Sequence, residues 1–328
     1  MKEAFSIVGA RIAPGTRETV SLPVPRLYTH AELDIPVHVV HGRRPGPRLF
    51  VSAAVHGDEI NGVEIIRRLL RLKILEKLRG TLIAVPVVNV FGFINQSRYL
   101  PDRRDLNRSF PGSHHGSLAA RMARLFADEI VGLATHGIDL HTGSNHRTNL
   151  PQIRASLDDP ETAGMAHAFG APVILDSTLR DGSLRQAGFD RKLPMLLYEA
   201  GEALRFNELA IRTGMRGIVG VMRSIGMLRH TKKSRAAPTL STVARSSYWQ
   251  RAPISGVLHG SVRLGTEVAK GQKIANIADP LGNDILPIRA ASAGVVIGRL
   301  MLPLVHQGDA LLHIARLDRP LATAKPAG

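Results

Sequence analysis

A histidine and a glutamate lie three residues apart in the segment His56-Gly57-Asp58-Glu59. Residues 49–55 before them form a short apolar run, typical of a buried strand, and Gly57 permits a sharp turn. From about residue 61 to residue 78, apolar side chains recur near a 3.6-residue period, which predicts a helix. The pair is therefore expected on a strand-to-helix loop at the carboxyl edge of a sheet, where it could bind zinc together with a third ligand. A solvent-exposed loop histidine is the alternative interpretation.

A second predicted strand, residues 137–143, carries His141 just before a glycine-containing turn. It follows an amphipathic stretch that Ser117 is placed to cap, which gives the order strand, helix, strand. We nominate His141 as the third zinc ligand; a histidine that hydrogen-bonds at the end of a buried strand is the alternative. Asp139 faces the same side as His141 and could support a metal-bound histidine, or be an unrelated buried acid.

Two further polar clusters follow predicted strands. An arginine-rich loop, residues 96–112, comes after the apolar run 81–88. Arginine binds carboxylates through a planar, bidentate fork, so several arginines at a strand end indicate an anionic substrate, with a solvated loop as the alternative. The apolar run 194–198 ends in Glu199, which is either a general base for a metal-bound water or a structural acid.

Four motifs taken together resemble the succinylglutamate desuccinylase/aspartoacylase family of zinc carboxypeptidase-like hydrolases. The motifs are His56-x-x-Glu59, the run from Asp105 to Gly112, the strand end from Asp139 to Gly143, and Tyr198-Glu199-Ala200-Gly201. They occur in the family's order. The resemblance implies an α/β fold with a zinc-carboxypeptidase-like mixed sheet flanked by helices.

The resemblance also implies roles for individual residues. The implied ligands of one zinc ion per chain are His56, Glu59 and His141. The residues implied to act in catalysis are Glu199, which activates the water, and Arg98, which steadies the oxyanion. The residues implied to hold the substrate are Asn107, Arg108 and Arg185. Along the sequence, the spacing between Arg185 and Glu199 is longer than the corresponding spacing in aspartoacylase.

The composition limits the class of protein. A chain of 328 residues with 44% hydrophobic residues is long for one domain and comfortable for two. The absence of cysteine excludes disulfides and cysteine-ligated metals, so histidine and glutamate are the plausible metal ligands. The N-terminal residues lack an apolar signal region, and no apolar run reaches the ~18 residues of a membrane span. We expect a soluble cytoplasmic protein with no membrane partner.

The net charge of +16 raises the possibility that the protein binds nucleic acid. The positive excess is spread along the chain, and aromatic residues make up only 4%, which leaves few platforms for base stacking. We therefore expect no nucleic-acid partner, and a positive cleft that attracts a small anionic substrate. A homo-oligomer is compatible with the sequence.

A boundary is expected near residue 235, in a basic segment without an apolar period. The expected domains are a hydrolase domain, residues 1–235, and a C-terminal β domain with its linker, residues 236–328. Residues 252–258 are echoed by 290–296, and this near-twofold repeat resembles the biotinyl/lipoyl barrel-sandwich fold. The hairpin 278–284 lacks the lysine of a carrier domain, so we expect a β domain beside the catalytic cleft. Trp249 is expected to anchor the linker.

Three functions compete. The first is a zinc-dependent hydrolase of linear, non-peptide amide bonds that deacylates a small N-acyl amino acid or N-acyl diamino acid. The second is a zinc carboxypeptidase-type peptidase, and the third is a non-catalytic binding or carrier protein. The complete set of ligand and base residues argues against the third function. The C-terminal β domain, which in related proteins narrows access to the metal, favours small substrates over peptides.

Overall fold

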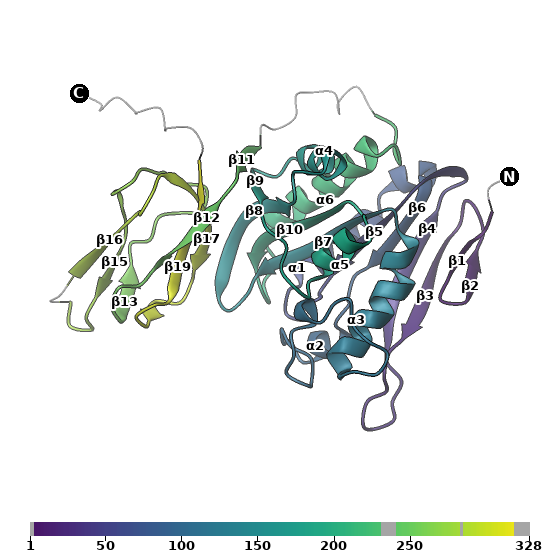
Figure 1. The fold of residues 1–328 in the computed structure, drawn as a ribbon, viewed down its shortest axis with the longest axis horizontal. Coiled ribbons are helices and arrows are strands. Elements are labelled where there is room, and N and C mark those ends of the chain that lie inside the picture. The colour runs from purple at the N-terminus through teal and green to yellow at the C-terminus, as the bar shows by residue number, and fades with distance from the viewer. Residues whose placement is uncertain (1–2, 231–240, 283–284, 318–328) are drawn as a thin grey trace.

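Five strands open the chain, strands and helices are then interspersed as far as residue 224, and the described elements after it are strands (Figure 1). The strands are β1 (Phe5–Ile7), β2 (Ala10–Ile12), β3 (Arg17–Pro23), β4 (Asp34–His41), β5 (Arg44–Ala53), β6 (Arg79–Val85), β7 (His136–Gly143), β8 (Arg147–Ala155), β9 (Val173–Asp176), β10 (Met195–Glu202), β11 (Thr242–Ala244), β12 (Ser247–Arg251), β13 (Gly256–His259), β14 (Glu267–Val268), β15 (Lys273–Ala278), β16 (Ile285–Arg289), β17 (Gly294–Leu300), β18 (Leu304–Val305) and β19 (Ala310–Arg316). The helices are α1 (Asn61–Leu70), α2 (Val90–Ile94), α3 (Leu118–Glu129), α4 (Pro160–Phe169), α5 (Leu184–Asp190) and α6 (Glu208–Ser224), with short 3-10 turns η1 (Lys73–Lys77), η2 (Leu106–Arg108) and η3 (Val131–Leu133).

One mixed sheet of 13 strands runs through the molecule. This computed structural model describes residues 3–230, 241–282 and 285–317. The main path of the sheet is β12-β19-β17-β8-β10-β7-β5-β6-β4-β3. Strands β10, β7, β5 and β6 pair in parallel, and the path continues antiparallel beyond them on both sides. The α/β mixed sheet expected from the sequence is confirmed.

Helices cover both faces of the parallel centre. One core cluster joins α1, α4 and α6 to one face through residues such as Ile66, Phe169 and Ile218. A second cluster joins α3 and α5 to the other face through residues such as Phe126 and Leu184. Every residue of β7 is buried, as expected for a parallel strand covered on both sides.

The local predictions around the site hold in part. Ser117 caps α3 as expected, because its side chain accepts a hydrogen bond from the Ala120 N–H at 3.3 Å. The expected helix from residue 61 to residue 78 is shorter, since α1 ends at Leu70 and the chain continues through η1. Leu75 and Leu78 are still buried, which explains why the apolar period looked continuous.

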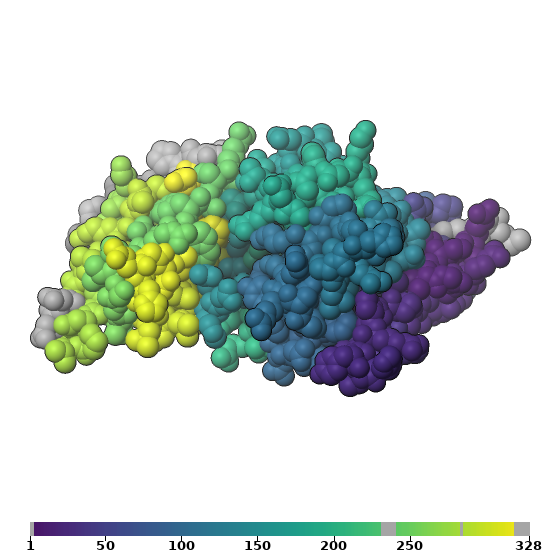
Figure 2. Space-filling model, turned by 60° about the horizontal axis from the view of Figure 1, so that its bottom comes forward, coloured from purple at the N-terminus to yellow at the C-terminus, as the bar shows by residue number. Residues whose placement is uncertain are grey.

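The C-terminal strands extend the same sheet. β17 pairs with β8, and β11 pairs with β9, so strands after residue 240 are joined by backbone hydrogen bonds to strands before residue 231. A separate four-stranded sheet, β16-β15-β13-β18, completes this part around its own apolar core. Figure 2 shows these strands (green to yellow) at one end of an elongated molecule and the N-terminal strands (purple) at the other. The expected boundary after residue 235 lies outside the described residues.

The chain offers no membrane-spanning segment where its structure is described. Across residues 3–230, 241–282 and 285–317, no helix is both long and apolar enough to cross a membrane.

Candidate functional site

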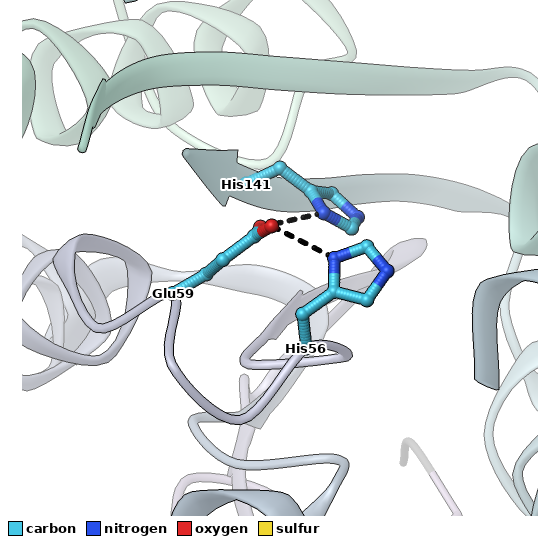
Figure 3. A group of neighbouring side chains, drawn as sticks. All are labelled: His56, Glu59 and His141. Carbon is cyan, nitrogen blue, oxygen red and sulfur yellow. Dashed lines mark hydrogen bonds and ion pairs between the residues drawn. The ribbon is translucent and has the colours of Figure 1, made fainter. Parts of the chain in front are cut away.

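Three buried side chains from two neighbouring strand ends converge on one point (Figure 3). Glu59 Oε1 lies 2.8 Å from His56 Nδ1, and Glu59 Oε2 lies 2.8 Å from His141 Nδ1. One ligand-type atom from each residue lies within 4.8 Å of the others. Two imidazole nitrogens and a carboxylate oxygen are the donors that zinc prefers in three-ligand protein sites. The structure therefore brings together the three residues nominated from the sequence.

Parallel pairing places these residues. β5 and β7 are neighbours in register, with Ala53 opposite Leu140, so the loop after β5 opens beside His141. Gly57 lets this loop pass close to α2, because a Cβ there would lie 2.0 Å from the Gly92 carbonyl carbon. Helix α1 then begins at Asn61, two residues after Glu59.

A carboxylate holds the far nitrogen of each imidazole. His141 Nε2 lies 2.7 Å from Asp139 Oδ2, and Asp139 also accepts a hydrogen bond from the Ser52 hydroxyl at 2.7 Å. His56 Nε2 lies 3.0 Å from Asp105 Oδ1. An N–H at Nε2 that donates to a carboxylate leaves the Nδ1 lone pair available to a metal. The expectation that Asp139 supports His141 thus matches the observed contact, whereas Asp105 received no role from the sequence.

The electrostatics favour positive charge between the two rings. Burial lowers the pKa of His141, but Asp139 and Glu59 outweigh it and hold that pKa well above its usual value. Burial also lowers the pKa of His56, but Glu59 and Asp105 outweigh it and raise that pKa above its usual value. Burial raises the pKa of Glu59, yet the two imidazoles hold it well below its usual range. Either protons or a bound cation can supply the charge that these carboxylates stabilise.

Arg98 lies at the same point. Its Nη1 is 3.2 Å from Glu59 Oε1, and its Nη2 donates to Asp105 Oδ2 at 2.9 Å. Burial raises the pKa of Asp105, but His56 and Arg98 together hold it well below its usual value. Asp105 therefore links a histidine and an arginine that are 42 residues apart in the chain.

The predicted substrate-binding residues line the same cavity but differ in burial and in their hydrogen bonds to the protein. Asn107 is buried, and its Oδ1 accepts a hydrogen bond from the Leu184 N–H at 2.9 Å. Arg108 is exposed, with Nη1 donating to the Asn107 carbonyl. Arg185 is buried and braces the neighbouring loop, because it donates to the Ser177 hydroxyl at 2.8 Å and to the Ser177 carbonyl at 3.0 Å.

Glu199 lies on β10, opposite His141 in the parallel register. Its side chain is 18% exposed and lines the cavity, which has a volume of about 560 Å³. Glu199 Oε2 accepts a hydrogen bond from the Asn149 amide at 2.5 Å, and Oε1 lies 3.6 Å from Arg154 Nε. A half-buried carboxylate beside the His-Glu-His cluster has the position of a group that can exchange protons with a reacting water.

The cavity carries a positive excess. Its basic lining residues are Arg98, Arg108, Arg147, Arg154, Arg180, Arg185 and Arg245, against the acids Glu59, Asp176 and Glu199. Burial, then the charges of Arg154 and Arg180, lower the pKa of Arg185 to about 10. Such mutual repulsion among cations is relieved by an anionic ligand.

C-terminal residues form one wall of this cavity; the sequence predicted a β domain beside the cleft but not which of its residues line it. The wall residues are Arg245, Ser246, Ser247, Trp249 and His313. Trp249 stacks on His313 with ring centroids 4.5 Å apart and planes 9° apart. Trp249, which was expected to anchor the linker, lies in the cavity lining. No local motif marks these residues, since strand pairing far along the chain brings them to the site.

Comparisons with known proteins point to one family. Residues 45–225 match the model of the succinylglutamate desuccinylase/aspartoacylase catalytic domain. Over 298 residues the chain is 29% identical to the N-alpha-acetyl-L-2,4-diaminobutyric acid deacetylase of Halomonas elongata, covering 88% of this chain and 87% of that protein.

Solved structures give the same result at the level of the fold. A succinylglutamate desuccinylase/aspartoacylase from Rhodobacter sphaeroides superposes with a TM-score of 0.82 at 26% identity, covering 92% of this chain and 95% of that one. The product-bound ectoine utilization protein EutE (DoeB) from Ruegeria pomeroyi also has a TM-score of 0.82, at 24% identity, covering 96% and 99%.

Proposed function

Because the chain belongs to the succinylglutamate desuccinylase/aspartoacylase family, we propose that it is a zinc-dependent hydrolase that deacylates a small, anionic N-acyl amino acid. The observation that carries the proposal is the buried cluster of His56, Glu59 and His141. Its donor atoms suit zinc, and outer carboxylates orient both imidazoles toward the same point. We assign one zinc ion to this cluster.

The neighbouring residues supply the remaining chemistry. When bound, zinc would acidify a water molecule and polarise the amide carbonyl. Glu199 accepts a proton from the attacking water and passes it to the departing amine. Arg98 stabilises the negative charge that develops on the carbonyl oxygen. Asn107 and Arg108 hold the substrate carboxylate, and Arg185, which lines the same cavity, is proposed as a further substrate-binding residue.

The charge and shape of the cavity support the substrate class. Seven arginines against three acids favour an anionic substrate. The wall formed by the C-terminal strands supports a small molecule over a peptide, so a zinc carboxypeptidase-type peptidase is the second candidate. An N-acyl diamino acid stays within the proposal, since the Halomonas elongata relative is named for an N-acetylated one. The organisation proposed with it is a hydrolase domain to residue 235 and a barrel-sandwich β domain from residue 236.

The proposal is tested by metal analysis and a substrate panel. We expect about one zinc per chain after dialysis, and hydrolysis of N-acyl amino acids detected as free amine. His56→Ala and His141→Ala each remove a ligand, so both should lose more affinity than the roughly 10- to 100-fold caused by losing an outer partner. His115→Ala, which changes an exposed histidine, is the matched control and should keep its zinc.

Three outcomes would contradict the proposal. Full zinc content in either ligand variant removes the cluster as the metal site. Release of C-terminal residues from peptides, without deacylation, identifies a peptidase. Zinc binding without turnover of either substrate class leaves a binding protein.

A further inference from the structure

We propose that Asn149 is a positioning residue for Glu199, and that the C-terminal part of the sheet keeps Asn149 in place through Gly298. The inference rests on the proposed role of Glu199 as the proton carrier. It assigns the C-terminal strands a part in the reaction, besides closing one side of the cavity.

The contact between the two side chains is direct. The Asn149 amide donates to Glu199 Oε2 at 2.5 Å, and Asn149 is only 7% exposed. The terminal torsion of a glutamate is broad, so an unheld carboxylate samples many orientations. One donor on Oε2 fixes the plane of the group and leaves Oε1 for the reacting water. Arg154 Nε, 3.6 Å from Oε1, is too distant for a hydrogen bond and acts through its charge.

An irregular strand register creates this contact. On β10, the pairing with β8 shifts between Glu199 and Gly201, and Gly201 is the residue opposite Asn149. The shift brings the amide of Asn149 back to the carboxylate two residues earlier. Gly201 also has a positive φ of 74°, a conformation that favours glycine. The bulge thus aims a β8 side chain at the proposed proton carrier.

Gly298 is the residue of the C-terminal strands that packs closely against Asn149. In the pairing of β17 with β8, Gly298 lies opposite Asn149. A Cβ added at Gly298 would lie 3.0 Å from Asn149 Oδ1 and 3.0 Å from the His313 Cβ. The missing side chain therefore leaves just enough room for Asn149, and a single methyl group would displace one of its neighbours.

The same row continues to the end of the sheet. Gly298 pairs with His313 on β19, and His313 pairs with Trp249 on β12. The rings of His313 and Trp249 are stacked, so the row behind Gly298 is packed and resists displacement. Glu199, Asn149, Gly298, His313 and Trp249 thus form one line of neighbours across five strands.

The deciding experiment is a double-mutant cycle between Asn149→Leu and Glu199→Gln. Leucine has a similar size but no donor, so kcat should fall roughly 10- to 100-fold from misplacement of the carboxylate. KM, zinc content and Tm should stay close to wild type. In the Glu199→Gln background the same change should cost less than about 3-fold, because a residue acting through the carboxylate has nothing left to position. Thr148→Ala, on the same strand, is the matched control.

Gly298→Ala tests the C-terminal contribution independently, and decides the matter if Asn149→Leu does not fold. We expect kcat to fall several-fold with KM unchanged, and again little effect in the Glu199→Gln background. A rise in KM with kcat preserved would show that Asn149 binds substrate. Equal losses in the wild-type and Glu199→Gln backgrounds would show a general structural effect. Either result overturns the inference.

Failure of the proposed function gives a different result. If the wild-type protein turns over no acylated amino acid, the proposed function fails and the cycle on kcat is void. Crystal structures of the wild type and Asn149→Leu then decide the positioning claim. A displaced Glu199 carboxylate supports it, and an unmoved one overturns it.

Discussion

Each imidazole in the cluster lies between two carboxylates, and this arrangement sets the charge of the site. Glu59 contacts both rings, while Asp105 and Asp139 hold the outer nitrogens of His56 and His141. With Arg98 included, three carboxylates face one permanent cation, a formal charge of −2 when both rings are neutral. One divalent cation neutralises this charge without protonating a ring. The same residues that orient the ligands therefore also favour a divalent metal over a monovalent one.

At the level of single residues, we predict the effect of replacing Glu199. Glu199→Gln keeps the shape of the side chain but cannot accept a proton, so kcat should fall by roughly 10²–10⁴. Zinc content should be unchanged, because Glu199 is outside the ligand cluster. Metal analysis and steady-state kinetics check both points. Glu202→Gln, on the same strand, is the control and should retain near-normal turnover.

The outcomes against this prediction are specific. Loss of zinc in Glu199→Gln would make Glu199 a ligand. Near-normal turnover would remove it from the mechanism.

The sequence was sufficient to nominate His56, Glu59 and His141, and Asp139 behind His141, but not Asp105 behind His56. His56, Glu59 and His141 could be predicted from the sequence because each follows a short apolar run that indicates a strand. Parallel strands end at the same edge of a sheet, so these residues are expected to lie close together. The contact of Asp105 with His56 spans 49 residues, and it depends on how the arginine-rich loop folds back. No periodicity encodes such a contact. The family resemblance implied a substrate-binding role for Arg185, but the hydrogen bonds of its guanidinium to Ser177 could not be predicted from the sequence.

At the level of elements, close approach of α1 to the sheet fixes the geometry of the cluster. Gly62, in the first turn of α1, lies against β5 and β7: an added Cβ would be 2.6 Å from the Ala53 Cβ and 2.8 Å from the Leu140 Cβ. Ala53 precedes the His56 loop, and Leu140 precedes His141. A glycine at this position therefore lets the helix bring Glu59 between the two histidines.

Gly62→Ala should consequently weaken both folding and metal binding. Overpacking a close contact costs about 1–3 kcal/mol, which exceeds the roughly 1 kcal/mol gained from helix propensity. Separation of α1 from the sheet should also move Glu59 away from His141 and lower zinc affinity. Urea unfolding and zinc titration check the two effects.

Gly164→Ala is the matched control in helix α4. A Cβ at Gly164 meets nothing within 4 Å, so this variant should gain about 0.5–1 kcal/mol and keep its zinc affinity. Normal stability and zinc affinity in Gly62→Ala would contradict the role given to the helix contact.

At the level of the whole molecule, the C-terminal strands are part of the sheet that carries the site. The glycine-spaced repeat predicted strands after residue 250, but the partner of β17 is β8, about 150 residues earlier in the chain. Edge pairing between distant strands follows from backbone geometry and leaves no local pattern. This is why the sequence placed a β domain beside the cleft but did not identify Trp249 and His313 as its wall.

His313 provides a prediction about this junction. It is 4% exposed, its Nε2 lies 2.8 Å from the Ser247 hydroxyl, and burial with the charges of Arg154 and Arg180 lowers its pKa to about 3. In the unfolded chain His313 therefore binds a proton near pH 6.5, whereas in the folded protein it does so only near pH 3. This contribution to the free energy of unfolding is fully present above pH ~6.5 and is lost as the pH falls, by at most about 1.4 kcal/mol per pH unit.

His313→Gln removes the titrating group while retaining a polar side chain. The difference in unfolding free energy between wild type and variant should be constant above pH ~6.5 and move against the wild type as the pH drops toward 4. Urea unfolding followed by circular dichroism measures it, and the fluorescence of Trp249, the single tryptophan of the chain, reports on the junction. Zinc loss at low pH affects both proteins and cancels in the difference. His259→Gln shows what removal of an exposed histidine does over the same range. A His313→Gln difference that stays flat down to pH 4 would mean that His313 protonates without opening the junction.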